Sequence, residues 1–143
     1  EPIWRSALDA QQTVAQVGRR GLANVHAHVD LIGQTVADDE WFAIVKWVIY
    51  GLVEAEEYGI TQANVDQMKS STDPVVQRIL GTSEDTGKLL GLDKEWLARA
   101  VKTTGNYGEM FERNVGPKSA LQLPRGLNNQ WNKGGLMYAP PVR

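Results

Sequence analysis

The sequence predicts a mostly α fold with about five or six short-to-medium helices and an irregular Gly/Pro-rich C-terminal tail, in one structural domain. An apolar run from Trp41 to Val53 is interrupted only by Lys46 and Gly51. Downstream, short amphipathic stretches alternate with capping residues and glycines, as is typical of helices. The length of 143 residues, with 42% apolar and 22% charged residues, fits a single globular domain. Cysteine is absent, which excludes a disulfide scaffold and a thiolate metal site.

Residues 1–37 form an N-terminal segment whose pattern fits two secondary structures. Apolar residues over 22–32 are spaced as on one face of a helix, and Ser6 is placed to cap an earlier helix. Residues 24–31 also alternate polar and apolar side chains, as a half-buried strand does. We favour a helix here because every later element is predicted to be helical.

The longest predicted helix starts at the acidic residues 38–40 and ends at Gly59. The carboxylates lie where a helix start has unpaired N–H groups. The apolar run within this helix has thirteen residues, which reach roughly 20 Å against a hydrocarbon core of about 30 Å. It is therefore predicted to be a buried core helix. Because its bulky residues face nearly every direction, it needs partners on most sides.

Four shorter helices are expected before the tail, each bounded by local signals. The first starts at Thr61 or Asn64. The second starts at Asp73-Pro74 and ends before Gly81, and the third starts at Asp93 and ends before Gly105. The fourth runs from about Tyr107 to Val115. From Pro117 onward, proline and glycine are frequent, which argues against long regular elements. The tail is too apolar for a free linker, so we expect it to pack along the helices. Its apolar residues are Leu121, Leu123, Leu127, Trp131, Leu136, Met137 and Tyr138.

The charges are unevenly distributed along the chain. The net charge of −2 gives no reason to expect a nucleic-acid partner. No acidic residue follows Glu112, however, and the basic residues after it are single and spaced. They are Arg113, Lys118, Arg125, Lys133 and Arg143. A nucleic-acid-binding arm usually clusters its basic residues. We therefore expect a basic tail folded onto an acidic body, and no nucleic-acid partner.

The residues most suggestive of a metal site are His26, His28 and Asp30. On a strand they would share one face and could hold a divalent cation, and their spacing resembles the His-x-His-x-Asp motif of metallo-β-lactamase-like hydrolases. That family has a further histidine after the aspartate, whereas Leu31 follows here, and this chain has only two histidines. On a helix the two rings would point about 200° apart. We expect surface or capping histidines and no metal; a metal-dependent hydrolase using His26 and His28 is the third-ranked hypothesis.

No other stretch of the sequence indicates catalysis. No serine stands in a Gly-x-Ser-x-Gly context. The acidic pairs at 38–39 and 56–57 are adjacent in sequence, so on a helix their side chains diverge by about 100°. No glycine pattern matches a phosphate-binding loop. We predict that the protein is not an enzyme and that it has no catalytic residue and no cofactor.

From residue 38 onward, ordered motifs cover about 106 of the 143 residues. The motifs are Asp38-Asp39-Glu40-Trp41-Phe42, Ile44-Val45-Lys46-Trp47, Ala55-Glu56-Glu57, Gly59-Ile60-Thr61, Asn64-Val65-Asp66, Arg78-Ile79-Leu80-Gly81, Leu90-Gly91-Leu92-Asp93, the run from Gly105 to Pro117, Arg125-Gly126-Leu127-Asn128, Trp131 and the run from Lys133 to Pro141. In this order they resemble the C-terminal part of periplasmic general L-amino-acid-binding proteins, the solute-binding proteins of polar amino-acid ABC transporters. Residues 1–37 carry no recognised resemblance, and residues 38–143 are expected to form the helical domain.

The resemblance implies a periplasmic, non-enzymatic protein of an amino-acid ABC transport system, with the transporter permease and an L-amino acid as partners. In that family the amino acid is clamped between two α/β lobes by residues that lie mostly upstream of the matched segment. No ligand-binding residue is therefore assigned here. The expected function is that of a truncated relative or fragment of such a protein, with the survival of ligand binding left open.

An alternative function belongs to the interaction class. In the family that the sequence resembles, the helix around residues 41–57 packs against the first lobe, so its apolar surface needs a substitute partner here. The alternative is a repurposed helical module that self-associates through the Trp41–Val53 face. An oligomer, or the N-terminal segment folding over this surface, would supply the missing partner, and we expect a homo-oligomer.

Overall fold

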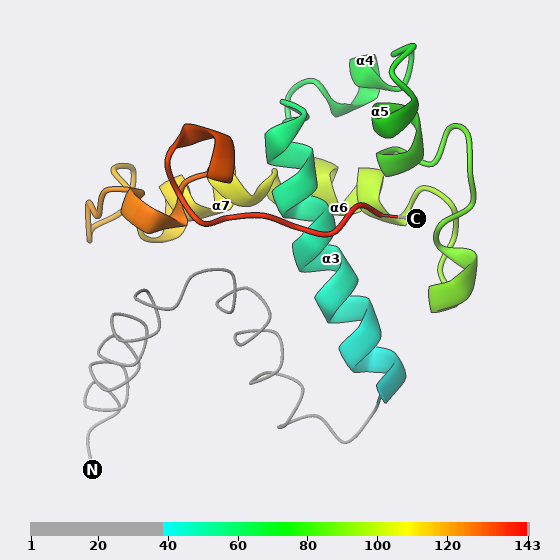
Figure 1. The fold of residues 1–143 in the computed structure, drawn as a ribbon, viewed down its shortest axis with the longest axis horizontal. Coiled ribbons are helices and arrows are strands. Elements are labelled where there is room, and N and C mark those ends of the chain that lie inside the picture. Colours follow the sequence, from blue (N-terminus) through cyan, green and yellow to red (C-terminus); the bar gives the residue numbers. More distant parts are fainter. Residues whose placement is uncertain (1–38, 143) are drawn as a thin grey trace.

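The computed structural model describes residues 39–142, and they are helical and irregular without a strand (Figure 1). The elements are α3 (Asp39–Glu57), α4 (Val65–Met68), α5 (Pro74–Ile79), η1 (Lys88–Leu90), α6 (Trp96–Thr104), α7 (Tyr107–Asn114), η2 (Gly126–Asn128) and η3 (Trp131–Lys133), where η denotes a 3₁₀ turn. An isolated bridge joins Gln130 to Met137 in the tail. The predicted mostly α class is confirmed. The expectations for residues 1–37, with His26, His28 and Asp30, lie outside the described residues.

The helix α3 is the central element of the fold. It contacts α5, α6 and α7, and Figure 1 shows the C-terminal segment crossing α3 near its middle. Within α3, burial is confined to one half: Tyr50 to Ala55 are buried, whereas Asp39 to Trp41 are exposed. Among the described helices, none is long and apolar enough to cross a bilayer.

The main core lies where α3 meets α5 and α6. Its buried side chains include Leu52 of α3, Ile79 of α5 and Leu97 of α6. Gly51 lies against Leu97, and a Cβ at residue 51 would come within 2.5 Å of that side chain. This close approach of α3 to α6 explains why a glycine interrupts an otherwise apolar helix.

Local signals set the helix ends largely as predicted. The side chain of Asp73 accepts hydrogen bonds from the N–H groups of Val75 and Val76, and proline occupies the first position of α5. Gly59 has a φ of +66° just after α3, a conformation that favours glycine. Helix α6 begins at Trp96, later than expected, because the carboxylate of Asp93 first closes a turn by accepting from the N–H of Glu95 at 2.9 Å.

The tail packs on the helices, as predicted, but through unexpected residues. Gln130 is 0% exposed, and its Nε2 donates to the carbonyl oxygen of Val53 in α3 at 3.0 Å. The apolar residues that prompted the prediction are largely outside: Leu121 is 60% exposed and Leu127 is also exposed. In the tail, burial follows the contacts with α3 rather than side-chain hydrophobicity alone.

The expected self-association face is smaller than predicted. Tyr50, Leu52 and Val53 are buried within the chain itself. They pack in two clusters, one with α5 and α6 and one with the tail residue Met137. Only residues 41–49 of the predicted Trp41–Val53 face retain exposed or half-buried side chains.

Candidate functional site

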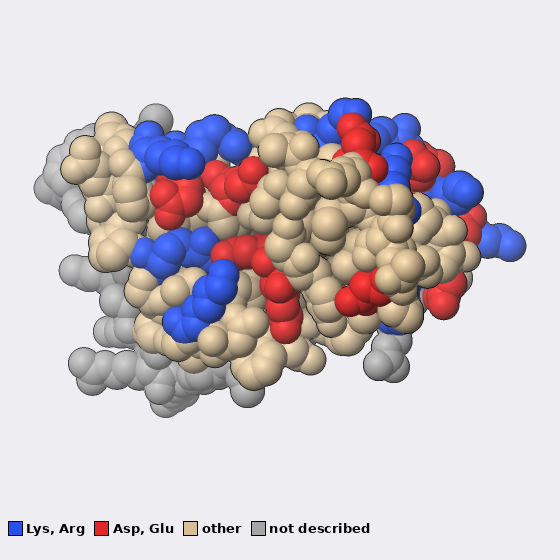
Figure 2. Space-filling model, turned by 90° about the horizontal axis from the view of Figure 1, so that it is seen from above, with Lys and Arg blue, Asp and Glu red and all other residues tan. Residues whose placement is uncertain are grey.

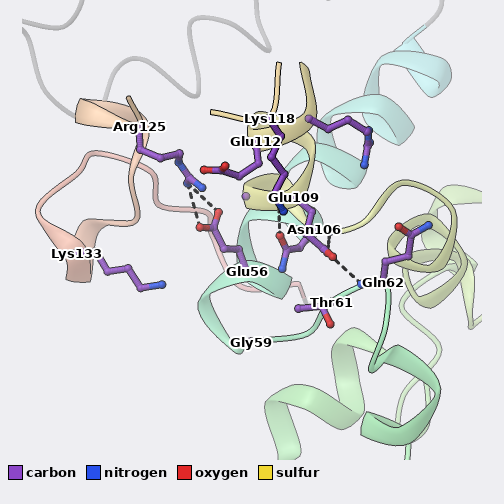
Figure 3. Close-up of a pocket in the computed structure, with 12 residues that line it drawn as sticks. Glu56, Gly59, Thr61, Gln62, Asn106, Glu109, Glu112, Lys118, Arg125 and Lys133 are labelled. Carbon is purple, nitrogen blue, oxygen red and sulfur yellow. Dashed lines mark hydrogen bonds and ion pairs between the residues drawn. The ribbon is translucent and has the colours of Figure 1, made fainter. Parts of the chain in front are cut away.

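A cleft of about 580 Å³ lies between α7, the loop after α3 and the C-terminal segment (Figure 3). We call it the tail cleft. It is lined by Glu56, Gly59, Thr61, Gln62, Asn106, Gly108, Glu109, Glu112, Arg113, Lys118, Arg125 and Lys133. Most of these side chains are charged or polar, so the cleft suits a polar ligand better than an apolar one.

A partly buried ion pair crosses the tail cleft. Nη2 of Arg125 lies 3.0 Å from each carboxylate oxygen of Glu56, and the two side chains are only 16% and 10% exposed. The guanidinium carbon of Arg125 lies 5.5 Å from the ring centroid of Tyr107 and 5.1 Å from that of Phe111. Nη2 of Arg125 also donates to the carbonyl oxygen of Asn128 at 2.8 Å. Arg125 is thus fully engaged in attaching the tail to α3 and α7.

Burial also affects the phenol that lies under Arg125. Desolvation raises the pKa of Tyr107 above its usual value, although the positive charge of Arg125 acts in the opposite direction. The Tyr107 ring is therefore neutral at physiological pH. It acts as an aromatic surface for the guanidinium rather than as a base.

Gly108 leaves room for this ion pair. A Cβ at residue 108 would lie 2.8 Å from the Glu56 carboxylate and 2.9 Å from Nη1 of Arg125. Any side chain here would push the two charged groups apart. The requirement for glycine therefore comes from a close approach and not from backbone conformation.

A capping box at the start of α7 forms the opposite wall. The Asn106 side chain accepts from the N–H of Glu109 at 3.0 Å, and the Glu109 carboxylate accepts from the N–H of Asn106 at 2.9 Å. The same carboxylate accepts from the N–H of Gln62 at 3.0 Å. The Asn106 amide also donates to the carbonyl oxygen of Ile60 at 2.8 Å. This network fixes α7 against the loop after α3.

Three basic side chains in the tail cleft lack a carboxylate partner among the described residues. Arg113 donates to the carbonyl oxygen of Thr104 at 3.0 Å. Lys118 and Lys133 make no side-chain hydrogen bond or ion pair within residues 39–142. Figure 2 shows acidic and basic side chains intermixed over the α7 end of the molecule.

The groups that line the tail cleft can be compared with what a metal site or a hydroxyl nucleophile would need. Within the described part of the chain, no group of His, Cys, Asp and Glu could hold a metal ion. The hydroxyl of Thr61 accepts from the N–H of Asn64 at 3.3 Å, and neither histidine of the chain falls in residues 39–142 to serve as its base. The two fixed carboxylates, Glu56 and Glu109, already accept hydrogen bonds.

Part of this site is predicted by the sequence. The charge distribution predicts a basic tail folded onto an acidic body, and Arg125 does pair with Glu56. Asn106 and Glu109 were not predicted, although an asparagine followed three residues later by a glutamate is a recognisable capping signal. No pattern in the neighbouring sequence indicates the roles of Gly108 and Gln130, because these roles depend on residues far away in sequence.

The comparisons with known proteins agree with the resemblance in the sequence. No family model matches the chain. The chain is 58% identical over 108 residues to the general L-amino acid-binding periplasmic protein AapJ of Rhizobium johnstonii. It is 52% identical over 107 residues to the glutamate/glutamine/aspartate/asparagine-binding protein BztA of Rhodobacter capsulatus. Each match takes in 74% of this chain and 32% of the relative, so the chain spans about a third of the length of these proteins.

A solved structure shows the same fold. The ABC transporter periplasmic binding protein of Brucella ovis, with glutathione bound, matches with a TM-score of 0.71 and 53% identity, over 75% of this chain and 34% of that one. In fold and sequence, the matched part of this chain is similar to a helical segment of the periplasmic binding proteins of ABC transporters. Within that class it is related to the amino-acid-binding proteins. The expected resemblance is confirmed, and the relatives that carry it are periplasmic binding proteins.

Proposed function

We propose that this chain serves within a periplasmic amino-acid-binding protein that delivers a polar amino acid to an ABC transporter permease. It would act as a non-enzymatic scaffold, with residues 38–143 as one helical unit. The observation that carries the proposal is the identity of more than half of the residues to AapJ and BztA across that unit. The hydrogen-bonded groups of the tail cleft are consistent with this role, because they join helices and tail to each other.

The N-terminal half of α3 supports the same proposal. Trp41 is 54% exposed, and Phe42, Ile44 and Val45 are only half-buried. An apolar helix of this kind is stable in water only when another surface covers it. The matched segment accounts for about a third of the relatives, so we propose that the corresponding remainder of an amino-acid-binding protein covers this half of α3.

A segment exchange would test the proposal. Residues 38–143 would replace the matched segment of AapJ, and the binding of L-glutamate and L-glutamine to the chimera would be measured by calorimetry. We expect both affinities to stay close to those of unmodified AapJ. A folded chimera that binds neither amino acid would contradict the proposal.

A variant of the chimera tests the role of α3. Ile44→Asp places a charge on the half-buried apolar face and should abolish binding or folding, because an unpaired charge would be desolvated there. Lys94→Asp, at an exposed position, is the matched control and should bind normally. Equal binding by both variants would exclude the proposed docking of α3.

Self-association is the second candidate, and the same half of α3 favours it. A second copy of the chain would cover residues 41–49 in place of a lobe. The test is the mass in solution by light scattering over a concentration series, with and without a mixture of L-amino acids. A dimer that is indifferent to amino acids and is dissociated by Ile44→Asp supports this candidate. A monomer at every concentration would eliminate it.

A further inference from the structure

The basic residues that follow the last acidic residue converge on the tail cleft. The cleft is lined by four of them, which lie between the last turn of α7 and η3: Arg113, Lys118, Arg125 and Lys133. Basic side chains spaced along a chain are usually found apart on the surface, because an isolated charge is better solvated by water than one placed near other positive charges. The fold therefore gathers the positive charge of the chain end in a single concave site.

The carboxylates of the tail cleft do not neutralise this charge. The lining includes four basic and three acidic side chains. Glu56 is paired with Arg125, and Glu109 is occupied by the N–H groups of Asn106 and Gln62. Hydrogen bonds from neutral N–H groups do not cancel the charge of Glu109. The two carboxylates Glu109 and Glu112 therefore stand against three basic side chains, and the net charge of the lining is +1. The unsatisfied charge in the cleft is therefore positive.

The two unpaired ammonium groups come from different walls. Lys118 follows α7, and Lys133 ends η3; Figure 3 shows Lys118 on the α7 side of the cleft and Lys133 on the η3 side. One exposed lysine holds an anion weakly. Two lysines on opposite sides can hold both ends of one molecule, because the second contact is made at a high effective concentration.

We propose that the tail cleft binds a small organic dianion with two carboxylates, one held by Lys118 and the other by Lys133. The cleft volume of about 580 Å³ is ample for a molecule of this size. The Glu56–Arg125 pair gives the site a fixed floor, and the Asn106–Glu109 capping box fixes its wall. This site goes beyond the proposed scaffold role and does not depend on it.

The experiment is a titration of the ¹⁵N-labelled chain with succinate at pH 7 and low ionic strength, followed by amide chemical shifts. We expect saturable shifts for residues of the cleft, including Gly108 and Asn106, with a dissociation constant in the millimolar range. Acetate, with one carboxylate, should bind at least about tenfold more weakly. Diaminobutane, of similar length but opposite charge, should cause no saturable shift at these residues.

Two double variants distinguish binding in the tail cleft from a nonspecific effect of the protein's positive charge. Lys118→Ala with Lys133→Ala should weaken succinate binding roughly tenfold or more. Lys88→Ala with Lys94→Ala removes the same charge from exposed positions outside the cleft and should change the affinity by less than about twofold. The proposal is wrong if succinate causes no saturable shift, if acetate binds equally well, or if both double variants lose affinity to the same extent.

Discussion

Single residues in this chain owe their importance to distant partners. Glu56 and Arg125 are 69 residues apart and form a partly buried pair. Removing one partner of such a pair costs more than the pair itself contributes, because it leaves a desolvated charge. Glu54, two residues before Glu56, is 4% exposed and accepts from the N–H of Val142 at 3.0 Å. Both contacts attach the tail to the last turns of α3.

Gly108→Ala should destabilise the fold by about 1–3 kcal/mol, because the added Cβ overlaps the Glu56 carboxylate and Arg125. The measurement is the free energy of urea unfolding. In a Glu56→Ala background the added cost of Gly108→Ala should shrink, since most of the overlap is removed. An equal cost in both backgrounds would show that the close contact is not the cause.

Glu54→Gln should change how stability depends on pH. Burial raises the pKa of Glu54 above 4.5, against a smaller lowering by the Val142 N–H and by Arg78 of α5, while Glu57 raises it further. The folded state therefore holds the proton more tightly than the unfolded state does. This contribution to stability is full below the unfolded pKa and is lost as pH rises through the folded pKa.

The glutamine variant keeps an acceptor for Val142 and does not titrate. Urea unfolding from pH 4 to pH 7 should show the native protein losing stability relative to Glu54→Gln as the pH rises. Glu84→Gln, at an exposed position, should follow the native protein. A constant difference between the native protein and Glu54→Gln across this range would contradict the raised pKa.

At the level of elements, the helix ends organise the structure. Helix α3 ends with three glutamates, an unfavourable charge near the negative end of the helix dipole. The tail offsets this by donating to each of them: Arg125 to Glu56, Trp131 to Glu57 and the Val142 N–H to Glu54. The end of α3 and the tail therefore stabilise each other.

Asn106→Ala should be the most damaging change at a helix end. It removes the cap of α7 and leaves the buried carbonyl of Ile60 without its donor. We expect a loss of about 2–4 kcal/mol, combining a lost cap with an unsatisfied buried group. Asn114→Ala is the matched control. Its amide donates to the Met110 carbonyl at an exposed position, and the loss in thermal stability should be small. Similar melting temperatures for the two variants would disprove this role of Asn106.

For the whole molecule, stability should be unequal along α3. The buried stretch Tyr50–Ala55 belongs to the core, whereas residues 41–49 are covered on fewer sides. Hydrogen exchange followed by mass spectrometry should show slow exchange in the first stretch and faster exchange in the second. If a second copy covers residues 41–49, their protection should rise with protein concentration. Uniform protection along α3 at low concentration would contradict this division.

The sequence by itself determined the class of fold and most helix bounds. Proline at the start of α5, Asp73 before it and Gly59 after α3 act through their own backbone neighbours, so these boundaries follow from local chemistry. The motifs from residue 38 onward also determined the relationship to amino-acid-binding proteins, which the comparisons confirm. Helix α6 starts later than predicted, because the Asp93 carboxylate accepts from the N–H of Glu95 in a turn that precedes the helix.

Only the tertiary structure decided which residues of the tail are buried and which residues meet in the tail cleft. Hydrophobicity favoured Leu121 and Leu127, yet Gln130 and Val142 are buried, because α3 offers them a carbonyl and a carboxylate. These contacts join residues 77 and 88 positions apart. No periodicity or capping signal spans such a separation. The path of the chain in space therefore fixed them, and it also gathered the spaced basic residues into one site.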